Sequence, residues 1–274
     1  SLDHFNFDES AQNFADGDLL ARSVNNSFSP LYKYFLGSLY WLFGRNLYLV
    51  YFIQFCMGAF SSVLIFLIGK RIFGTRAGMF AGLGLAFYTT HIIYEGIILR
   101  AAFISFWGVV SCYLLLRLKE NPKKFWLIWA TLSLSLFFQA RPNTFLCLPL
   151  ICVFLNRKVF LPLSTQQKAR FWKIFSGTLL ASFIPLLIQC YLVHGKFVFF
   201  DASAPHAFIS GNVVDYSGAG LEHEIVEEYS KTNPLDYGSN FLFVAHQILE
   251  KPFGFFLLYI RKLSFFLNDF EPPT

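Results

Sequence analysis

Long apolar runs separated by short charged segments constrain this chain more than any other feature. Residues 46–68 carry no charged side chain, and as a helix they are long enough to cross the ~30 Å hydrocarbon core of a bilayer. Further runs, apolar apart from Arg100, lie at 77–94, 97–116, 125–140, 142–155 and 174–193. Only 14% of the residues are charged, whereas a typical soluble domain has about 25%. The sequence therefore predicts an all-α fold, a polytopic membrane helix bundle of about six spanning helices.

The basic residues indicate how these helices are oriented. Lys and Arg concentrate in three connecting segments, at 69–76, 117–124 and 156–173. These segments hold 12 of the 22 Lys and Arg residues and a single acid, Glu120. By the positive-inside rule they face the cytoplasm, which leaves residues 1–45 and 194–274 outside. Because the two signs of charge are segregated along the chain, the net charge of +5 does not indicate nucleic-acid binding.

This topology divides the chain into three regions. Residues 1–45 form an outer segment with interfacial helices, residues 46–193 form the transmembrane bundle, and residues 194–274 form an outer loop region with further interfacial helices. The chain begins without Met in a polar stretch and ends abruptly, so we expect a fragment that lacks an upstream segment.

Capping residues predict two helices in the outer segment. The first covers the opening 15 residues, and Gly17 is suited to end it. The second begins at Ser29-Pro30, with Ser as the N-cap and Pro at the first helical position, and Gly44 ends it. This second helix is too short to span and is rich in aromatic residues, which suits the membrane interface.

The last region is predicted to mix loop and interfacial helix. Residues 205–220 are rich in Gly, Ser and Asn and read as loop. Asn233-Pro234 opens a helix that Pro252 breaks, and residues 253–266 form another. We expect that last helix to lie at the interface, because burying Arg261 and Lys262 in a membrane would be costly.

Three charged residues come from separate segments that the topology places at the same outer surface: Asp3, Glu95 and Arg141. A carboxylate can take a proton from an acceptor, and an arginine can hold a phosphate with paired donors. They would suit a site for an amphiphilic phosphate. The alternative is that the helix dipole favours Asp3 as an N-terminal acid, that Glu95 pairs with Arg100 at a hairpin turn, and that Arg141 snorkels to the interface.

Short motifs recur in a fixed order. The outer segment contains Asp3-His4-x-x-Phe7, Ala15-Asp16-Gly17-Asp18, Ser29-Pro30-Leu31-Tyr32-Lys33-Tyr34 and Leu42-Phe43-Gly44-Arg45. Arg71-Ile72-Phe73-Gly74, Tyr94-Glu95, Gln139-Ala140-Arg141-Pro142-Asn143 and Ile209-Ser210-Gly211-Asn212 follow. In this order they resemble the C-type membrane glycosyltransferases, the group that contains protein O-mannosyltransferases and lipid A aminoarabinose transferases. The resemblance covers nearly the whole chain.

The resemblance implies catalytic and donor-binding residues. Asp3 matches the first-loop Asp that acts as general base on the acceptor, and Glu95 matches a second-loop acid. Arg141 matches the Arg of an Arg-Pro turn, and we expect it to bind the donor phosphate together with Arg100.

Acceptor contacts are expected from both outer regions. His4 and Phe7 stand where the family usually has Glu and Tyr, and Asn212 lies in a Gly-Asn loop seen in bacterial members. Three other residues of the tail could touch the acceptor as well: Asp201, His206 and Asp215. No residue is assigned to a metal. No cofactor is certain, and a divalent metal stays open because His4 replaces a family carboxylate.

The implied activity moves a sugar from a polyprenyl-phosphate-linked donor to a lipid, glycan or protein acceptor on the outer face of the membrane. The acceptor attacks the anomeric carbon with inversion, Asp3 takes its proton, and polyprenyl phosphate leaves. We expect a multi-pass protein of the bacterial plasma membrane that serves cell-envelope glycosylation. Its partners are membrane lipid, the donor and the acceptor, and no nucleic acid.

Two other functions remain open. A transporter or flippase of an amphiphilic lipid-linked substrate would also suit an apolar bundle, but it should carry ionisable groups or broken helices near mid-membrane. The predicted charges lie at helix ends on one face instead, which favours surface chemistry. A non-catalytic membrane scaffold would leave Asp3 and Arg141 free to change without effect.

Overall fold

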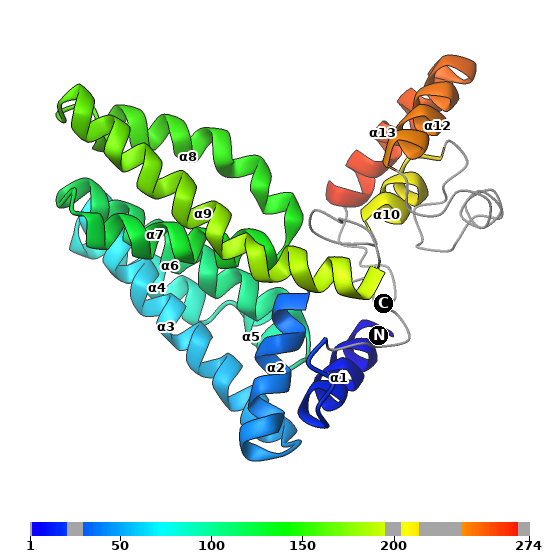
Figure 1. Cartoon of the computed structure of the whole chain (residues 1–274), viewed down its shortest axis with the longest axis horizontal. Helices are drawn as coiled ribbons and strands as arrows, with labels where there is room; N and C mark the ends of the chain where they lie inside the picture. Colours follow the sequence, from blue (N-terminus) through cyan, green and yellow to red (C-terminus); the bar gives the residue numbers. More distant parts are fainter. Residues whose placement is uncertain (1, 21–29, 195–203, 214–236, 268–274) are drawn as a thin grey trace. The chain divides into compact units, whose positions relative to one another are not determined.

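The computed structural model describes residues 2–20, 30–194, 204–213 and 237–267 (Figure 1). The chain divides into two compact units, Ser1–Phe200 and Asp201–Thr274, each of which is described by itself. Within the described ranges the regular structure is helical and contains no strand. The predicted all-α fold is therefore confirmed.

The unit Ser1–Phe200 begins with two helices joined by a polar connection. They are α1, Leu2–Ala15, and α2, Pro30–Phe43. Gly17 and Gly44 follow them with φ of 109° and 73°, in the left-handed region that glycine reaches without a steric penalty. Both predicted helices and both predicted stops are confirmed.

The long helix α3, Leu47–Phe73, forms a tight hairpin with α4, Thr75–Ala86. Asn46 caps α3 by accepting a hydrogen bond from the Leu49 amide at 3.2 Å. Small residues let the two helices approach closely, because a Cβ added at Gly78 would lie 2.5 Å from the Lys70 nitrogen.

The predicted span 77–94 is wrong as one continuous helix. The helix α4 ends at Ala86, and a separate short helix, α5, covers Thr89–Glu95. The chain leaves the helical conformation at Tyr88, whose φ of −73° and ψ of 101° are extended. Beyond α5, the Gln54 amide on α3 donates hydrogen bonds to the carbonyls of Glu95 and Ile97 and so holds the end of this short helix against α3.

Three more helices complete this bundle: α6, Arg100–Glu120, α7, Lys124–Ala140, and α9, Thr165–His194. Between α7 and α9 the chain forms a continuous helical stretch of three parts: η1, Pro142–Cys147, α8, Leu148–Phe154, and η2, Leu155–Val159. These helices occupy the four predicted apolar runs from 97 to 193. Three helices of the described ranges, α3, α6 and α9, are long and apolar enough to cross a membrane alone.

Hydroxyl groups link α6, α7 and α9 inside the bundle. Ser111 on α6 donates to Ser133 on α7, and Gln139 on α7 donates to the Ser182 carbonyl on α9 at 3.2 Å. Ser135 and Ser182 are also hydrogen-bonded. Such bonds hold apolar helices together where lipid supplies no hydrophobic drive.

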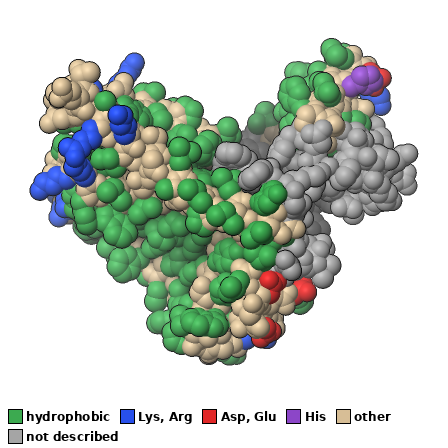
Figure 2. Space-filling model, viewed as in Figure 1, with side chains coloured by type: hydrophobic (Ala, Val, Ile, Leu, Met, Phe, Trp, Pro, Cys, Tyr) green, Lys and Arg blue, Asp and Glu red, His purple; other side chains and the backbone are tan. Residues whose placement is uncertain are grey.

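Basic side chains gather at one end of this unit, where the α3–α4, α6–α7 and α8–α9 connections lie (Figures 1 and 2). Arg71 and Glu120 form an ion pair at 3.1 Å that joins the first two of these connections. Within this unit, the acidic side chains visible in Figure 2 lie near α1, away from this end. The predicted separation of charge along the chain is thus a separation in space.

The other unit contains α10, Ala204–Gly211, α12, Tyr237–Glu250, and α13, Pro252–Leu267. The prediction of loop over 205–220 is wrong for its first part, because Pro205 lies in the first turn of α10. The predicted break at Pro252 is confirmed: α12 and α13 bend by 108°. By length and composition this bent pair also suits a broken span.

Candidate functional site

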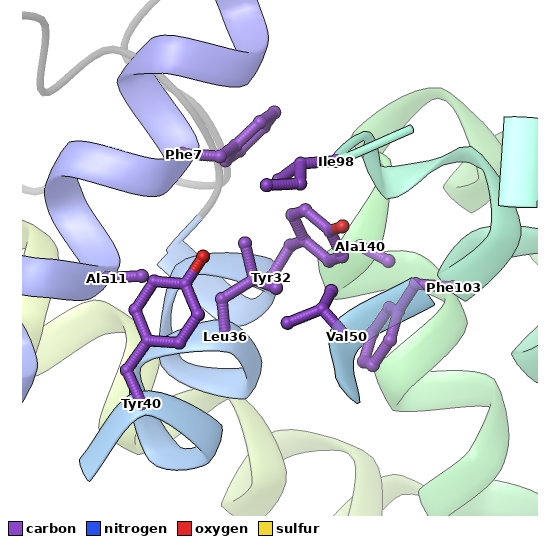
Figure 3. Packing of buried hydrophobic residues seen from close by; sticks show 9 residues of the cluster. All are labelled: Phe7, Ala11, Tyr32, Leu36, Tyr40, Val50, Ile98, Phe103 and Ala140. Atoms are coloured by element: carbon purple, nitrogen blue, oxygen red, sulfur yellow. The ribbon is translucent and has the colours of Figure 1, made fainter. Parts of the chain in front are cut away.

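One buried cluster brings together the segments that carry the predicted site residues (Figure 3). Phe7 belongs to α1, Ile98 to the α5–α6 connection and Ala140 to the end of α7. The cluster also contains side chains from α1, α2, α3 and α6: Ala11, Tyr32, Leu36, Tyr40, Val50 and Phe103. Predicted site residues therefore flank one core that five helices and one connection share.

Asp3 lies in the first turn of α1, where the structure describes its backbone. It precedes Phe7 by one turn, and the Phe7 ring meets Tyr32 edge-on with centroids 5.0 Å apart. Phe7 is only 1% exposed, so its ring serves the core and is not presented to an acceptor. His4 is half-buried and lies against Phe5, with ring centroids 4.2 Å apart.

A polar clamp that the sequence did not reveal fixes α1 to α2. Asp8 is buried, with 12% of its side chain exposed, and its carboxylate accepts a hydrogen bond from the Tyr40 hydroxyl at 2.6 Å. Arg45, just after α2, donates to it through Nε at 3.2 Å and Nη2 at 2.9 Å. Burial, together with the hydrogen bond to Asp8, raises the pKa of Tyr40, and the Asp8 carboxylate raises the pKa of Arg45. Both partners therefore remain proton donors at neutral pH.

Glu95 is the last residue of α5, before the turn that leads into α6, but its side chain is buried. Its side chain is 6% exposed and packs against Gly58, where a Cβ would overlap the carboxylate. Gly58 lies about 16 Å along α3 from Leu47 at 1.5 Å per residue, which is close to the middle of this helix. His91 Nε2 lies 3.1 Å from Glu95 Oε1, one turn earlier on α5. A histidine on the same short helix is thus the neighbour of a predicted catalytic acid.

The two expected donor-binding arginines lie at helix ends that the shared cluster brings together. Arg141 is exposed and follows Ala140 at the end of α7. Its carbonyl accepts from the Thr144 amide at 3.0 Å, which begins η1. Arg100 is half-buried and is the first residue of α6, two positions after Ile98.

Asn212 belongs to the other compact unit, so the structure does not relate it to the rest of the site. Its side-chain oxygen accepts from the Tyr259 hydroxyl at 3.2 Å and lies 3.5 Å from Lys262 Nζ. The side chains of the other tail candidates, Asp201, His206 and Asp215, lie outside the described residues. Among the described residues, no group of three His, Cys, Asp or Glu side chains is placed to hold a metal ion.

These features define a polytopic membrane protein whose candidate site lies around the core that α1 shares with the start of α6 and the end of α7. The model of the family of dolichyl-phosphate-mannose-protein mannosyltransferases matches residues 27–188, more than half of the chain. The chain belongs to this family. It is therefore an integral membrane glycosyltransferase of the C type, and its sugar donor is lipid-linked.

The match covers only part of the candidate site. It includes Glu95, Arg100 and Arg141, but it starts after α1 with Asp3 and ends before Asn212. The searches of curated proteins and of solved structures returned no match to this chain.

Proposed function

We propose that this protein moves a sugar from a polyprenyl-phosphate carrier to a lipid, glycan or protein acceptor at the outer face of a bacterial plasma membrane. The observation that carries the proposal is the shared core of Phe7, Ile98 and Ala140. This core holds the helix of a candidate base beside the segments that bear two arginines. A base and a phosphate ligand held around one core are what displacement of a lipid phosphate requires.

In the proposed reaction the acceptor oxygen or nitrogen attacks the anomeric carbon from the face opposite the phosphate. A new glycosidic bond forms with inversion while the bond from carbon to phosphate oxygen breaks. Asp3 takes the proton of the acceptor, and the electron pair leaves on polyprenyl phosphate. Arg141, exposed at the end of α7, and Arg100 stabilise the negative charge of the leaving phosphate.

In this proposal Glu95 has a structural role in the site and does not contact the substrates. A carboxylate buried against Gly58 and paired with His91 is better placed to fix α5 on α3 than to touch substrate. By fixing the end of α5, Glu95 helps to position the connection that leads to Arg100.

The outward orientation rests on the basic end of the bundle, which the positive-inside rule places in the cytoplasm. Cysteines introduced at Asn25 and Ser217 should then react with an impermeant thiol reagent from outside intact cells. A cysteine at Gln166, in a basic segment predicted to face the cytoplasm, should not react with this reagent. Outside labelling at Gln166 would reverse the orientation.

The main test replaces Asp3 with Asn in the full-length protein, in membranes supplied with lipid-linked sugar. Asp3→Asn keeps the size of the side chain but cannot take a proton, so transfer should fall roughly 10²- to 10⁴-fold while donor binding survives. Glu9→Gln is the matched control, because Glu9 is an exposed acid on the same helix. If Asp3→Asn transfers sugar as well as the parent, Asp3 is not the base.

One observation favours a second function, transport of the lipid-linked sugar. The break between α4 and α5 and the buried Glu95–His91 pair near the middle of α3 are features that transporters use. Proteoliposomes separate the two functions. A transporter would move the lipid-linked sugar between leaflets without any acceptor, and a transferase would release polyprenyl phosphate only when an acceptor is present.

A further inference from the structure

Gln54 is a fully buried amide in the first third of the mainly apolar helix α3, with 0% of its surface exposed. A polar side chain inside a membrane helix must find hydrogen-bond partners, and such residues tend to serve a site. Gln54 finds three. Its Oε1 accepts from the Tyr32 hydroxyl at 2.7 Å, and its Nε2 donates to the carbonyls of Glu95 at 2.8 Å and Ile97 at 3.0 Å.

The two carbonyls explain why the amide lies there. The helix α5 ends at Glu95 and α6 begins at Arg100, so carbonyls of the connection have no regular helical donor. Nε2 supplies one to each of two such carbonyls. Since carbonyls only accept, the amide nitrogen must face them, and the amide oxygen then faces Tyr32.

Tyr32 carries this link to the first two helices. It lies on α2, and its ring contacts Phe7 on α1 edge-on and Phe103 on α6 at a centroid distance of 5.9 Å. Burial raises the pKa of Tyr32, so its hydroxyl remains a donor to Gln54. One amide thus connects the helix pair that carries Asp3 with the connection that leads to Arg100, the first residue of α6.

We propose that Gln54 is a positioning residue of the transfer site, which sets the distance between the candidate base on α1 and the phosphate ligand on α6. The proposal deepens the proposed function and rests on it. In the ground state Asp3 contacts the acceptor and Arg100 contacts the donor phosphate, each independently of the other. In the transition state both groups must act at the same time, so the distance between them matters most there. A small misplacement therefore lowers kcat more than it raises KM.

The test compares two variants with a matched control in the full-length protein. Gln54→Met preserves size and removes all three hydrogen bonds, and kcat per folded molecule should fall about 10- to 100-fold with KM for the donor changed less than about threefold. Tyr32→Phe removes one bond and keeps the ring, so its kcat should fall about threefold. Ser133→Ala also removes a buried bond between helices but lies far along the chain from the link, and its kcat should stay at the parent level.

Hydrogen exchange supplies a readout that does not depend on activity. The peptide covering residues 95–100 should exchange faster in Gln54→Met, and to a smaller extent in Tyr32→Phe, than in Ser133→Ala. Unchanged kcat and KM per folded molecule would reduce Gln54 to a packing residue. If Gln54→Met does not fold, Tyr32→Phe decides: unchanged kcat together with unchanged exchange overturns the proposal. If the parent transfers no sugar, the proposed function fails, and the exchange result still decides whether the link exists.

Discussion

Asp8, Tyr40 and Arg45 form the clamp between α1 and α2. The burial of each contact predicts which of three substitutions in it lowers the free energy of unfolding most. The perturbation is removal of each partner in turn: Asp8→Ala, Tyr40→Phe and Arg45→Met. The hydrogen bond from Tyr40 ends on a buried carboxylate, and bonds to charged groups contribute about 1.5–3 kcal/mol. The Arg45 side chain is 49% exposed, and an ion pair in that setting contributes about 0–1 kcal/mol.

Tyr40→Phe should therefore lower the free energy of unfolding by more than Arg45→Met does, although Arg45 makes the formal ion pair. Asp8→Ala removes both interactions and leaves the Tyr40 hydroxyl without its acceptor, so its loss should be the largest, about 2–4 kcal/mol. The assay is thermal unfolding in detergent micelles, combined with limited proteolysis of the connection that follows α1. Sugar transfer should fall with the loss of docking, because α1 carries Asp3.

A larger loss for Arg45→Met than for Tyr40→Phe would refute this reasoning. It would mean that the ion pair, and not the buried hydrogen bond, holds α1 in place. A double-mutant cycle between Asp8 and Tyr40 isolates the pair term. Because of these contacts, Asp8→Asn cannot serve as a neutral control for Asp3→Asn.

Two further predictions concern the other charged residues of the site. Gly58→Ala should lower the free energy of unfolding by about 1–3 kcal/mol, because its Cβ would overlap the Glu95 carboxylate. Gly84→Ala is the control and should be neutral or stabilising, because nothing lies within 4 Å of the added Cβ. Equal unfolding temperatures of the two variants would contradict the close contact between Gly58 and Glu95. Arg141→Lys keeps the charge but loses the planar fork, so donor affinity measured with labelled lipid-linked sugar should fall while the protein stays folded. Unchanged affinity in Arg141→Ala would remove the phosphate role and leave a side chain that snorkels to the interface.

Local patterns predicted those parts of the fold that depend on local physics. Apolar runs between basic segments gave α3, α6, α7 and α9, because a helix in lipid needs little beyond length and the absence of charge. Gly17 and Gly44 marked two helix ends for an equally local reason, their positive φ. The helix α10 was not predicted, because residues 205–220 are rich in Gly, Ser and Asn and such composition is typical of loops. Pro205 and Gly211 nevertheless lie at the start and the end of this helix.

The clamp and the Gln54 link could not be found in this way. Asp8 meets partners 32 and 37 positions away, and Gln54 meets partners 22, 41 and 43 positions away. Nothing in the residues around Asp8 or Gln54 indicates which distant group will face them. The burial of Glu95 likewise depends on Gly58 on another helix, which leaves room for its carboxylate. Nothing in the residues around Glu95 distinguishes this buried position from a surface turn.

The burial of Glu95 changes what the turn between α5 and α6 means for this bundle. A break between two apolar helices would expose unpaired carbonyls to lipid, and such a defect persists only where protein supplies donors. Here Gln54 supplies them and Gly58 supplies the space for the acid. This turn and its two partners on α3, Gln54 and Gly58, therefore form one unit, in which an inward bend of the chain leads to Arg100 at the start of α6. In a family that handles lipid-linked sugars, that bend places a cation beside the helix of the candidate base, and this favours surface transfer over passage through the bundle.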